Sequence, residues 1–143
     1  MHLAFQTQFM KINKNKTIGF LNLSSGAEGI ASVVSYPYVL KSVNEAYAIL
    51  SGSAGAEISL DPFTVYSLLM VTLLLGIANL YIGYKNFFKS NLLDDAAKGK
   101  YFKWGMLLLV LISLAGIAFS AVLMGPLANS ISPTLDMINS LSQ

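Results

Sequence analysis

The sequence lacks cysteine and arginine, and it has one histidine, His2, close to its beginning. Without cysteine, a disulfide framework, a thiolate nucleophile and a Cys-ligated metal site are excluded. A Ser–His–Asp triad would have only His2 to draw on, and no glycine-rich phosphate-binding loop is present. These absences predict a protein that is not an enzyme and that has no bound metal or cofactor.

Charge is also scarce. Charged residues make up 11% of the 143 residues, whereas hydrophobic residues make up 55%. An average soluble domain is about 25% charged and about 45–50% apolar. All nine basic residues are lysines, and with seven acidic residues they give a formal net charge of +2. This composition argues against a disordered chain and against an ordinary water-exposed surface.

Two long stretches contain no Asp, Glu, Lys or Arg: residues 62–84, with 23 residues, and residues 104–135, with 32 residues. Gly125-Pro126 interrupts the second stretch and leaves 22 residues before the proline. Helices of these two lengths are roughly 33–35 Å long, which matches a hydrocarbon core of about 30 Å. A chain of this size has too little polar material to cover two such helices. We therefore predict an all-α fold in which residues 62–125 form a membrane-type antiparallel hairpin.

The residues at the ends of these stretches favour helix termini. Asp61-Pro62 offers a capping carboxylate followed by proline at the first helical position. Pro126 and Pro133 discourage a simple continuation of the second helix, although they are compatible with a kinked extension. We expect residues 126–143 to form a C-terminal tail with a short helix around residues 134–141.

A basic loop is predicted at residues 85–103, between the two apolar helices. It contains five lysines: Lys85, Lys89, Lys98, Lys100 and Lys103. The aromatic residues near its margins include types that favour membrane–water boundaries: Tyr81, Tyr84, Tyr101 and Trp104. Because short lysine-rich loops favour the cytoplasmic side, both ends of the chain are expected on the other side of the membrane.

The lysines of this loop have two interpretations. They are expected to anchor the protein at the membrane surface, with their charged ends in water. Alternatively, they contact anionic lipid or nucleic acid. Such contact would be independent of base sequence, because lysine binds phosphate as a point charge and no arginine is available for bidentate base recognition.

The N-terminal third is predicted to contain a polar arm at residues 1–25 and an amphipathic helical segment at residues 26–52. No cleavable secretory leader is expected, because the lysines follow the first apolar residues rather than precede them. Ser25 and Glu28 have the spacing of a capping box, so ordered structure is expected to begin there. Pro37 is expected to open a second helical piece or to kink a continuous one.

The segment around and after Pro37 carries one apolar face. Its apolar residues recur at spacings of four and three: Tyr36, Leu40, Val43, Tyr47 and Leu50. We expect this face to pack across the hairpin or against a neighbouring molecule. The glycines and serines of residues 51–55 are expected to end the helix.

Small residues in the apolar stretches are candidates for close helix packing. Gly76 and Gly83 lie seven residues apart on one side of the first helix, and Ser113, Gly116 and Ser120 recur along the second. Close backbone approach contributes to helix association in lipid, where apolar attraction between helices is weak. The pattern indicates hairpin closure or self-association without choosing between them. Asn79, the one carboxamide within residues 63–84 and 104–125, is expected to form an interhelical hydrogen bond.

Taken together, residues 63–84 and 104–125, a loop whose basic residues are all lysine, and the absence of cysteine resemble the very hydrophobic capsid proteins of spindle-shaped archaeal viruses. The resemblance is architectural and covers residues 63–143. It implies helical hairpins that reside in the host membrane and then assemble with copies of themselves into the shell of the virion. The leading prediction is therefore a structural, self-assembling major capsid protein that contacts lipid, itself and packaged DNA.

A second resemblance is to conjugation-type pilins, including archaeal DNA-import pilins. These also place two apolar helices around a short basic loop, and they bind lipid in an extracellular filament. The chain departs from that pattern in lacking a credible cleavable leader and in having a loop of nineteen residues. Two further hypotheses are an accessory subunit of a membrane enzyme complex and a pore-forming hairpin such as a holin.

Overall fold

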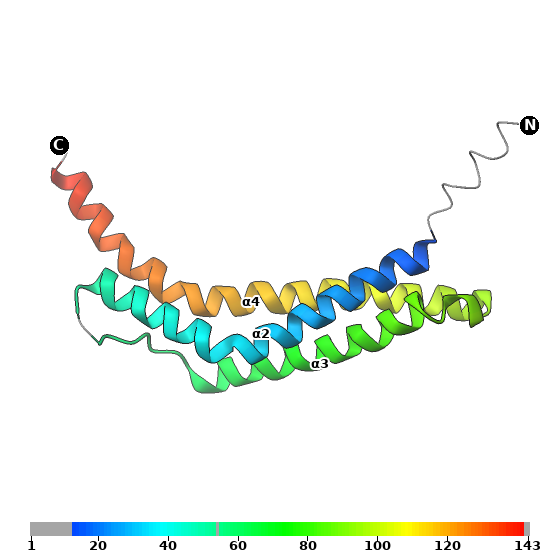
Figure 1. Ribbon diagram of the computed structural model, residues 1–143. Helices are drawn as coiled ribbons and strands as arrows, with labels where there is room; N and C mark the ends of the chain where they lie inside the picture. Colours follow the sequence, from blue (N-terminus) through cyan, green and yellow to red (C-terminus); the bar gives the residue numbers. More distant parts are fainter. Residues whose placement is uncertain (1–12, 54, 142–143) are drawn as a thin grey trace, which may run out of the picture.

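In the computed structural model, residues 13–53 and 55–141 are described, with the backbone alone for residues 131–139 and 141. These residues form the helices α2 (Lys14–Ser51), α3 (Pro62–Phe87) and α4 (Asp95–Leu141), and the short 3₁₀ helix η1 (Ser90–Leu92) (Figure 1). No strand occurs among them. The predicted all-α class is confirmed.

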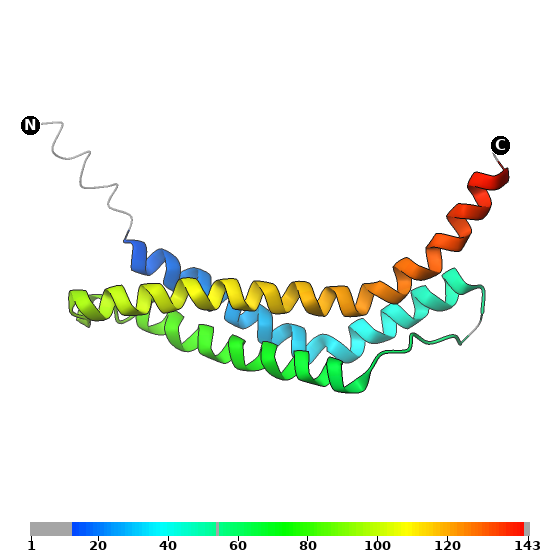
Figure 2. The same ribbon diagram turned by 180° about the vertical axis from the view of Figure 1, so that it is seen from behind.

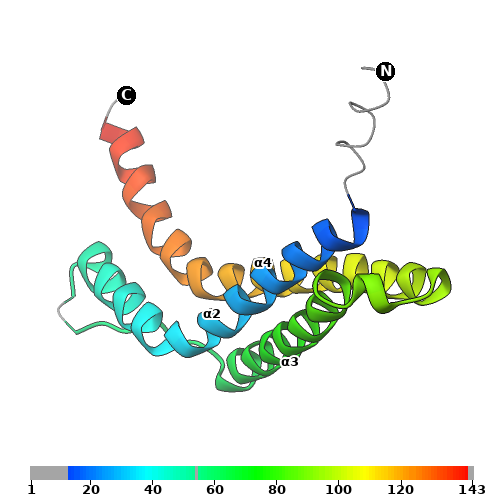
Figure 3. The same ribbon diagram turned by 45° about the vertical axis from the view of Figure 1, so that its right-hand side comes forward.

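The three long helices pack lengthwise against one another (Figures 1 and 2). α3 is antiparallel to both α2 and α4, so α3 and α4 form the expected hairpin and α2 is added as a third rod parallel to α4. The start of α2 lies at the same end of the bundle as the connection between α3 and α4. The end of α4 extends beyond the other helices and bends away from them, as Figure 3 shows.

The start of α3 is capped as the sequence predicts. A carboxylate oxygen of Asp61 accepts a hydrogen bond from the backbone amide of Thr64 at 2.8 Å, and Pro62 is the first helical residue. Hydrogen bonds from the hydroxyl and the backbone amide of Thr64 lower the pKa of the Asp61 carboxyl, because they stabilise its ionised form. The cap therefore contributes to stability above the ordinary pKa of aspartate, and this contribution is lost as the pH falls through the lowered pKa.

The connection between α3 and α4 is shorter than the predicted loop at residues 85–103. α3 continues to Phe87 and α4 begins at Asp95, which leaves residues 88–94 as the connection. Asp94 supplies the helix-start chemistry, because its carboxylate accepts a hydrogen bond from the backbone amide of Ala97 at 2.7 Å. The lysines after Asp95 therefore lie on the first turns of a helix, and the loop prediction was wrong for them.

The C-terminal tail predicted at residues 126–143 is not a separate element. α4 runs without interruption through Pro126 and Pro133 to Leu141. Each proline removes one backbone hydrogen bond but fits helical φ, so the helix continues and bends instead of ending. The kinked extension left open from the sequence is the structure that forms.

α2 begins much earlier than expected. Its first residue is Lys14, and the side chain of Asn13 caps it by accepting a hydrogen bond from the backbone amide of Lys16 at 3.3 Å. The predicted polar arm at residues 1–25 was therefore wrong for residues 14–25, and residues 1–12 lie outside the described residues. Ser25 and Glu28 lie inside the helix and form no cap. Packing against α3 and α4, rather than local propensity, extends this helix.

The second half of α2 confirms part of the expected apolar face. Val43 is buried, and the ring of Tyr36 packs edge-on against Phe119 with a centroid distance of 5.9 Å. Leu50, the last residue of the face, is exposed. The helix ends at Gly52, whose left-handed φ of 66° glycine adopts readily. α2 is bent in its middle, and it contains Pro37 (Figure 3).

Candidate functional site

The most deeply buried side chains of the described residues are polar. Asn22, Asn79, Asn86 and Ser90 are the largest side chains that are less than 2% exposed. A buried amide left without hydrogen bonds costs about 1–3 kcal/mol, so the arrangement around these asparagines decides whether the bundle is stable.

Polar and small residues line the faces on which α2 and α3 meet. Along each helix they recur at alternating spacings of four and three, the spacing that keeps one face of a helix toward its partner. We call these ten residues the polar seam: Asn15, Gly19, Asn22, Gly26 and Gly29 on α2, and Thr72, Gly76, Asn79, Gly83 and Asn86 on α3.

One amide pair in the seam joins all three helices. The Nδ2 group of Asn22 donates to Oδ1 of Asn79 at 2.6 Å and to the backbone oxygen of Gly105 at 2.9 Å. The Nδ2 group of Asn79 donates to the backbone oxygens of Leu75 at 2.9 Å and of Leu108 at 3.3 Å. The interhelical hydrogen bond expected of Asn79 is confirmed.

The same arrangement recurs one heptad away. The Nδ2 group of Asn15 donates to Oδ1 of Asn86 at 3.0 Å and to the backbone oxygen of Lys98 at 2.9 Å. The Nδ2 group of Asn86 donates to the backbone oxygen of Tyr101 at 2.9 Å. Every residue of this second group lies seven positions from its counterpart in the first, so the two groups fix the register of the three helices together.

Glycine is required where the backbones meet. A Cβ atom at Gly19 would lie 2.5 Å from the backbone nitrogen of Phe87, and one at Gly83 would lie 2.8 Å from that of Leu23. A Cβ atom at Gly105 would lie 2.6 Å from Oδ1 of Asn22. The close approach at Gly76 and Gly83 therefore joins α3 to α2, and Gly105 brings α4 onto the pair.

The small residues predicted on α4 are placed differently. Ser113, Gly116 and Ser120 are exposed, and a Cβ atom at Gly116 would meet nothing within 4 Å. They take no part in closing the hairpin. Gly105, which does, was not identified from the sequence. The heptad spacing of asparagine and glycine over residues 15–29 was the signal that could have located α2 and its partners.

Large apolar side chains lie outside the seam. Phe63 is 79% exposed and Ile117 is 66% exposed, and many other apolar residues of α3 and α4 face outward with them. α3 and residues 95–130 of α4 are long and apolar enough to cross a membrane. Only 28% and 22% of their most apolar windows are buried in the bundle, whereas the core helix of a soluble protein is mostly buried.

Seven lysines gather at the end of the bundle where α2 begins and α3 connects to α4. The hydrogen bond from Asn15 to the backbone of Lys98 places the start of α2 beside the start of α4. The seven are Lys14, Lys16, Lys85, Lys89, Lys98, Lys100 and Lys103. Two aspartates, Asp94 and Asp95, lie among them, and Lys98 pairs with Asp95 at 3.2 Å. We call this region the lysine-rich end.

The predicted interfacial aromatic residues lie at the same end. The Nζ atom of Lys85 is 5.6 Å from the ring centroid of Tyr81, and that of Lys89 is 5.9 Å from the ring centroid of Tyr84. Tyr101 is half-buried and Trp104 is exposed on α4. The aromatic residues predicted at the margins of a long loop therefore lie at one end of the bundle.

The expected placement of both chain ends opposite the loop concerns residues 1–12 and 142–143, which lie outside the described residues, but the helices next to them lie at opposite ends of the bundle. The start of α2 lies at the lysine-rich end, whereas the end of α4 lies at the other end (Figure 1). The physical reason is that α2 packs lengthwise on the hairpin, so its start and its end lie at opposite ends of the bundle.

No family model matches the chain, and neither a curated protein nor a solved structure matches it.

The glycine contacts give a first prediction. Replacing Gly83 by leucine forces side-chain atoms into the backbone of α2, and we expect it to lower the stability of the bundle by about 1–3 kcal/mol or more. Thermal unfolding of the detergent-solubilised chain, followed by circular dichroism, measures the change. Gly99→Leu is the matched control, because a Cβ atom at Gly99 meets nothing within 4 Å. Equal unfolding midpoints for the two variants would contradict the packing described.

The amide pair gives a second prediction. Asn22→Leu or Asn79→Leu leaves the other buried amide without its partner, so we expect each to destabilise the bundle by about 1–3 kcal/mol. The double variant is expected to cost less than the sum of the two, with a coupling of about 0.5–3 kcal/mol. Chemical unfolding in detergent measures the cycle, and Asn91→Leu, at an exposed position, is the control. Strict additivity would show that the pair contributes nothing jointly.

Proposed function

We propose that the chain is a membrane-embedded structural protein that assembles with copies of itself and has no catalytic activity. The observation that carries this proposal is the inverted arrangement of side chains, with asparagine at the centre of the bundle and large apolar side chains on its outside. Water is a poor solvent for such a surface, whereas lipid or another apolar protein face is a good one.

The lysine-rich end supports an orientation in the membrane. Lysines gather on the cytoplasmic side of membrane proteins, where anionic lipids attract them. Lys14 and Lys16 on α2 add to the lysines of α3 and α4 at this end, and the tyrosines beside them suit the headgroup region. We place this end on the cytoplasmic side, with α3 and α4 crossing the bilayer.

Self-assembly is supported by small residues of α4 that are exposed and take no part in closing the hairpin. Ser113, Gly116 and Ser120 follow one exposed row of α4, and no other part of the described chain covers Gly116. Rows of small residues allow helices of neighbouring molecules to approach closely in lipid. A second copy that packs on this row would bury apolar surface on both molecules.

Among assemblies of this kind, the resemblance to capsid proteins of spindle-shaped archaeal viruses favours a virion shell. In such a shell the lysine-rich end would face packaged DNA and contact its phosphates without reading bases. A conjugation-type pilin filament is the second candidate, supported by the same hairpin and the same exposed apolar surface. The two differ in the form of the assembly, as a closed shell or an open filament.

Membrane extraction and electron microscopy test the proposal. After expression in a bacterial host, we expect the chain to sediment with membranes, to resist extraction at alkaline pH and to dissolve in detergent. Removal of the detergent is expected to yield regular shells, tubes or filaments. A freely dissolving monomer in detergent-free buffer, or a lone chain that never associates, would contradict the proposal.

Gly116→Leu tests the row on α4 separately from the fold. The bundle tolerates the new side chain, so the unfolding midpoint is expected to stay unchanged while assembled material falls about fivefold or more, as an overpacked contact of about 1–3 kcal/mol implies. Ala128→Leu, also on an exposed face of α4 but outside the row, is the control. Unchanged assembly by Gly116→Leu would exclude this row as the contact.

A further inference from the structure

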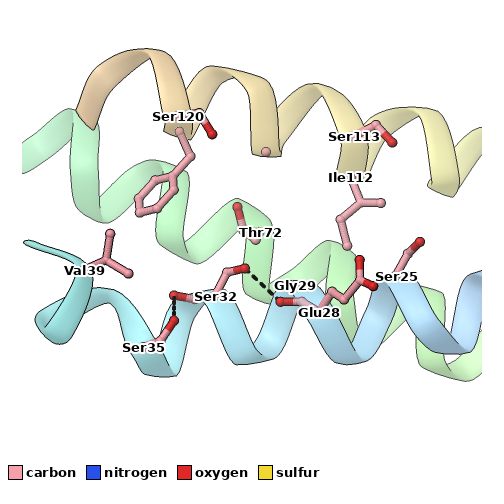
Figure 4. Close-up of a pocket in the computed structure, with 12 residues that line it drawn as sticks. Ser25, Glu28, Gly29, Ser32, Ser35, Val39, Thr72, Ile112, Ser113 and Ser120 are labelled. Carbon is pink, nitrogen blue, oxygen red and sulfur yellow. Dashed lines mark hydrogen bonds between the residues drawn. The ribbon is translucent and has the colours of Figure 1, made fainter. Parts of the chain in front are cut away.

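A pocket of about 340 Å³ lies between α2 and α4, with α3 behind it (Figure 4). Glu28 is the one ionisable side chain among the residues that line it. Most of the other polar lining consists of hydroxyl groups: Ser25, Ser32, Ser35, Thr72, Ser113 and Ser120. A carboxylate surrounded by hydroxyl oxygens is an unusual lining for a bundle whose other outward faces are largely apolar.

Three of the serine hydroxyls donate hydrogen bonds to backbone oxygens of their own helices. The Oγ group of Ser32 donates to the backbone oxygen of Glu28 at 2.8 Å, and the Oγ group of Ser35 donates to that of Ser32 at 3.3 Å (Figure 4). The Oγ group of Ser113 donates to the backbone oxygen of Leu109 at 2.8 Å. A hydroxyl has one hydrogen and two lone pairs, so these oxygens offer the pocket lone pairs. An ionised carboxylate likewise only accepts.

Thr72 gives an independent indication of a ligand. Thr72 is 8% exposed, and its Oγ1 atom has no hydrogen-bond partner among the described residues. Figure 4 shows this oxygen directed from α3 into the space between α2 and α4. A buried hydroxyl without a partner costs free energy, and binding a cation through a lone pair of this oxygen would offset part of that cost.

The charge of Glu28 is also unbalanced. The ion pairs found in the described part of the chain join Lys41 to Glu45 and Lys98 to Asp95, and neither includes Glu28. Its neighbour Gly29 lies against Thr72 and Gly76, near the middle of α3, whereas the lysine-rich end is distant along the bundle. Glu28 is exposed, so its carboxylate can be reached from outside the bundle and is free to bind a cation.

We propose that this pocket binds one monovalent alkali cation, with the Glu28 carboxylate as the charged ligand and Thr72 and the serine oxygens as neutral ligands. Oxygen atoms are the ligands that hard cations prefer. One carboxylate balances one positive charge, whereas a divalent ion would leave the pocket with a net charge. The described residues contain no group of three or more His, Cys, Asp or Glu side chains suited to a transition metal.

The volume of the pocket exceeds that of a single bare ion, so water completes the coordination shell. This inference goes beyond the structural role proposed above and does not rest on it. The pocket lining belongs to one molecule, but Ser113, Gly116 and Ser120 are also the row proposed above for contact between copies. Cation binding is therefore measured on chains kept apart in detergent.

Direct binding of Na⁺ and K⁺ to the full chain in detergent tests the proposal. Isothermal titration calorimetry and ²³Na magnetic resonance are expected to show saturable binding of one ion per chain. The ion should also raise the thermal unfolding midpoint relative to choline chloride at equal ionic strength. Glu28→Gln is expected to abolish binding, and Thr72→Val to weaken it several-fold.

Glu45→Gln is the matched control, because it removes the same charge from the same helix outside the pocket. It is expected to bind the ion as the unaltered chain does. If Glu28→Gln fails to fold, the binding of Na⁺ and K⁺ by the unaltered chain still tests the proposal.

Three results would overturn the proposal. One is the absence of saturable Na⁺ and K⁺ binding by the unaltered chain. Another is equal binding by a folded Glu28→Gln variant. The third is recovery of Glu28 cross-linked by a zero-length carbodiimide to a lysine of another copy, which would show that a partner's ammonium group fills the pocket.

Discussion

The bundle depends on the hydrogen bonds of two asparagine pairs, placed one heptad apart between three helices. Asn22 with Asn79, and Asn15 with Asn86, each bind one another and the backbone of α4. Amide groups reach that backbone because Gly19, Gly83 and Gly105 let the helices approach closely. Apolar attraction between helices is weak where their surroundings are apolar, so directional hydrogen bonds and close packing determine both association and register.

Local chemistry at helix ends was predictable from the sequence. The cap at Asp61-Pro62 and the end of α2 near Gly52 follow from residue type and immediate neighbours. The interhelical hydrogen bond of Asn79 was predictable too, because it is the one carboxamide in the apolar stretches. The first half of α2 was not predicted. Asparagine, glycine and serine favour turns by local propensity, and only contacts with α3 and α4 make them helical. Likewise, the lysines after residue 95 indicate a loop by charge but lie on the first turns of α4.

Part of the candidate site was predictable, where its residues lie within one apolar stretch of the sequence. Gly76 and Gly83 were found because they lie in an apolar stretch, but their partner helix was not, since α2 is polar on the face that packs. The pocket at Glu28 combines residues of three helices and could not be assembled from one segment. The inner polar seam, the outer apolar surface and the lysine-rich end are the features on which the proposed membrane and self-assembly roles rest.

Labelling from the lipid phase tests the inverted arrangement of side chains most directly. The chain is reconstituted in liposomes with an apolar diazirine reagent, and the modified residues are mapped by mass spectrometry after illumination. The account predicts labels on outward residues such as Leu74, Leu114 and Ile117, and none on Leu108, Ile112 or Ala115, which face the other helices. Equal labelling of both sets, or labels confined to the inward set, would contradict it.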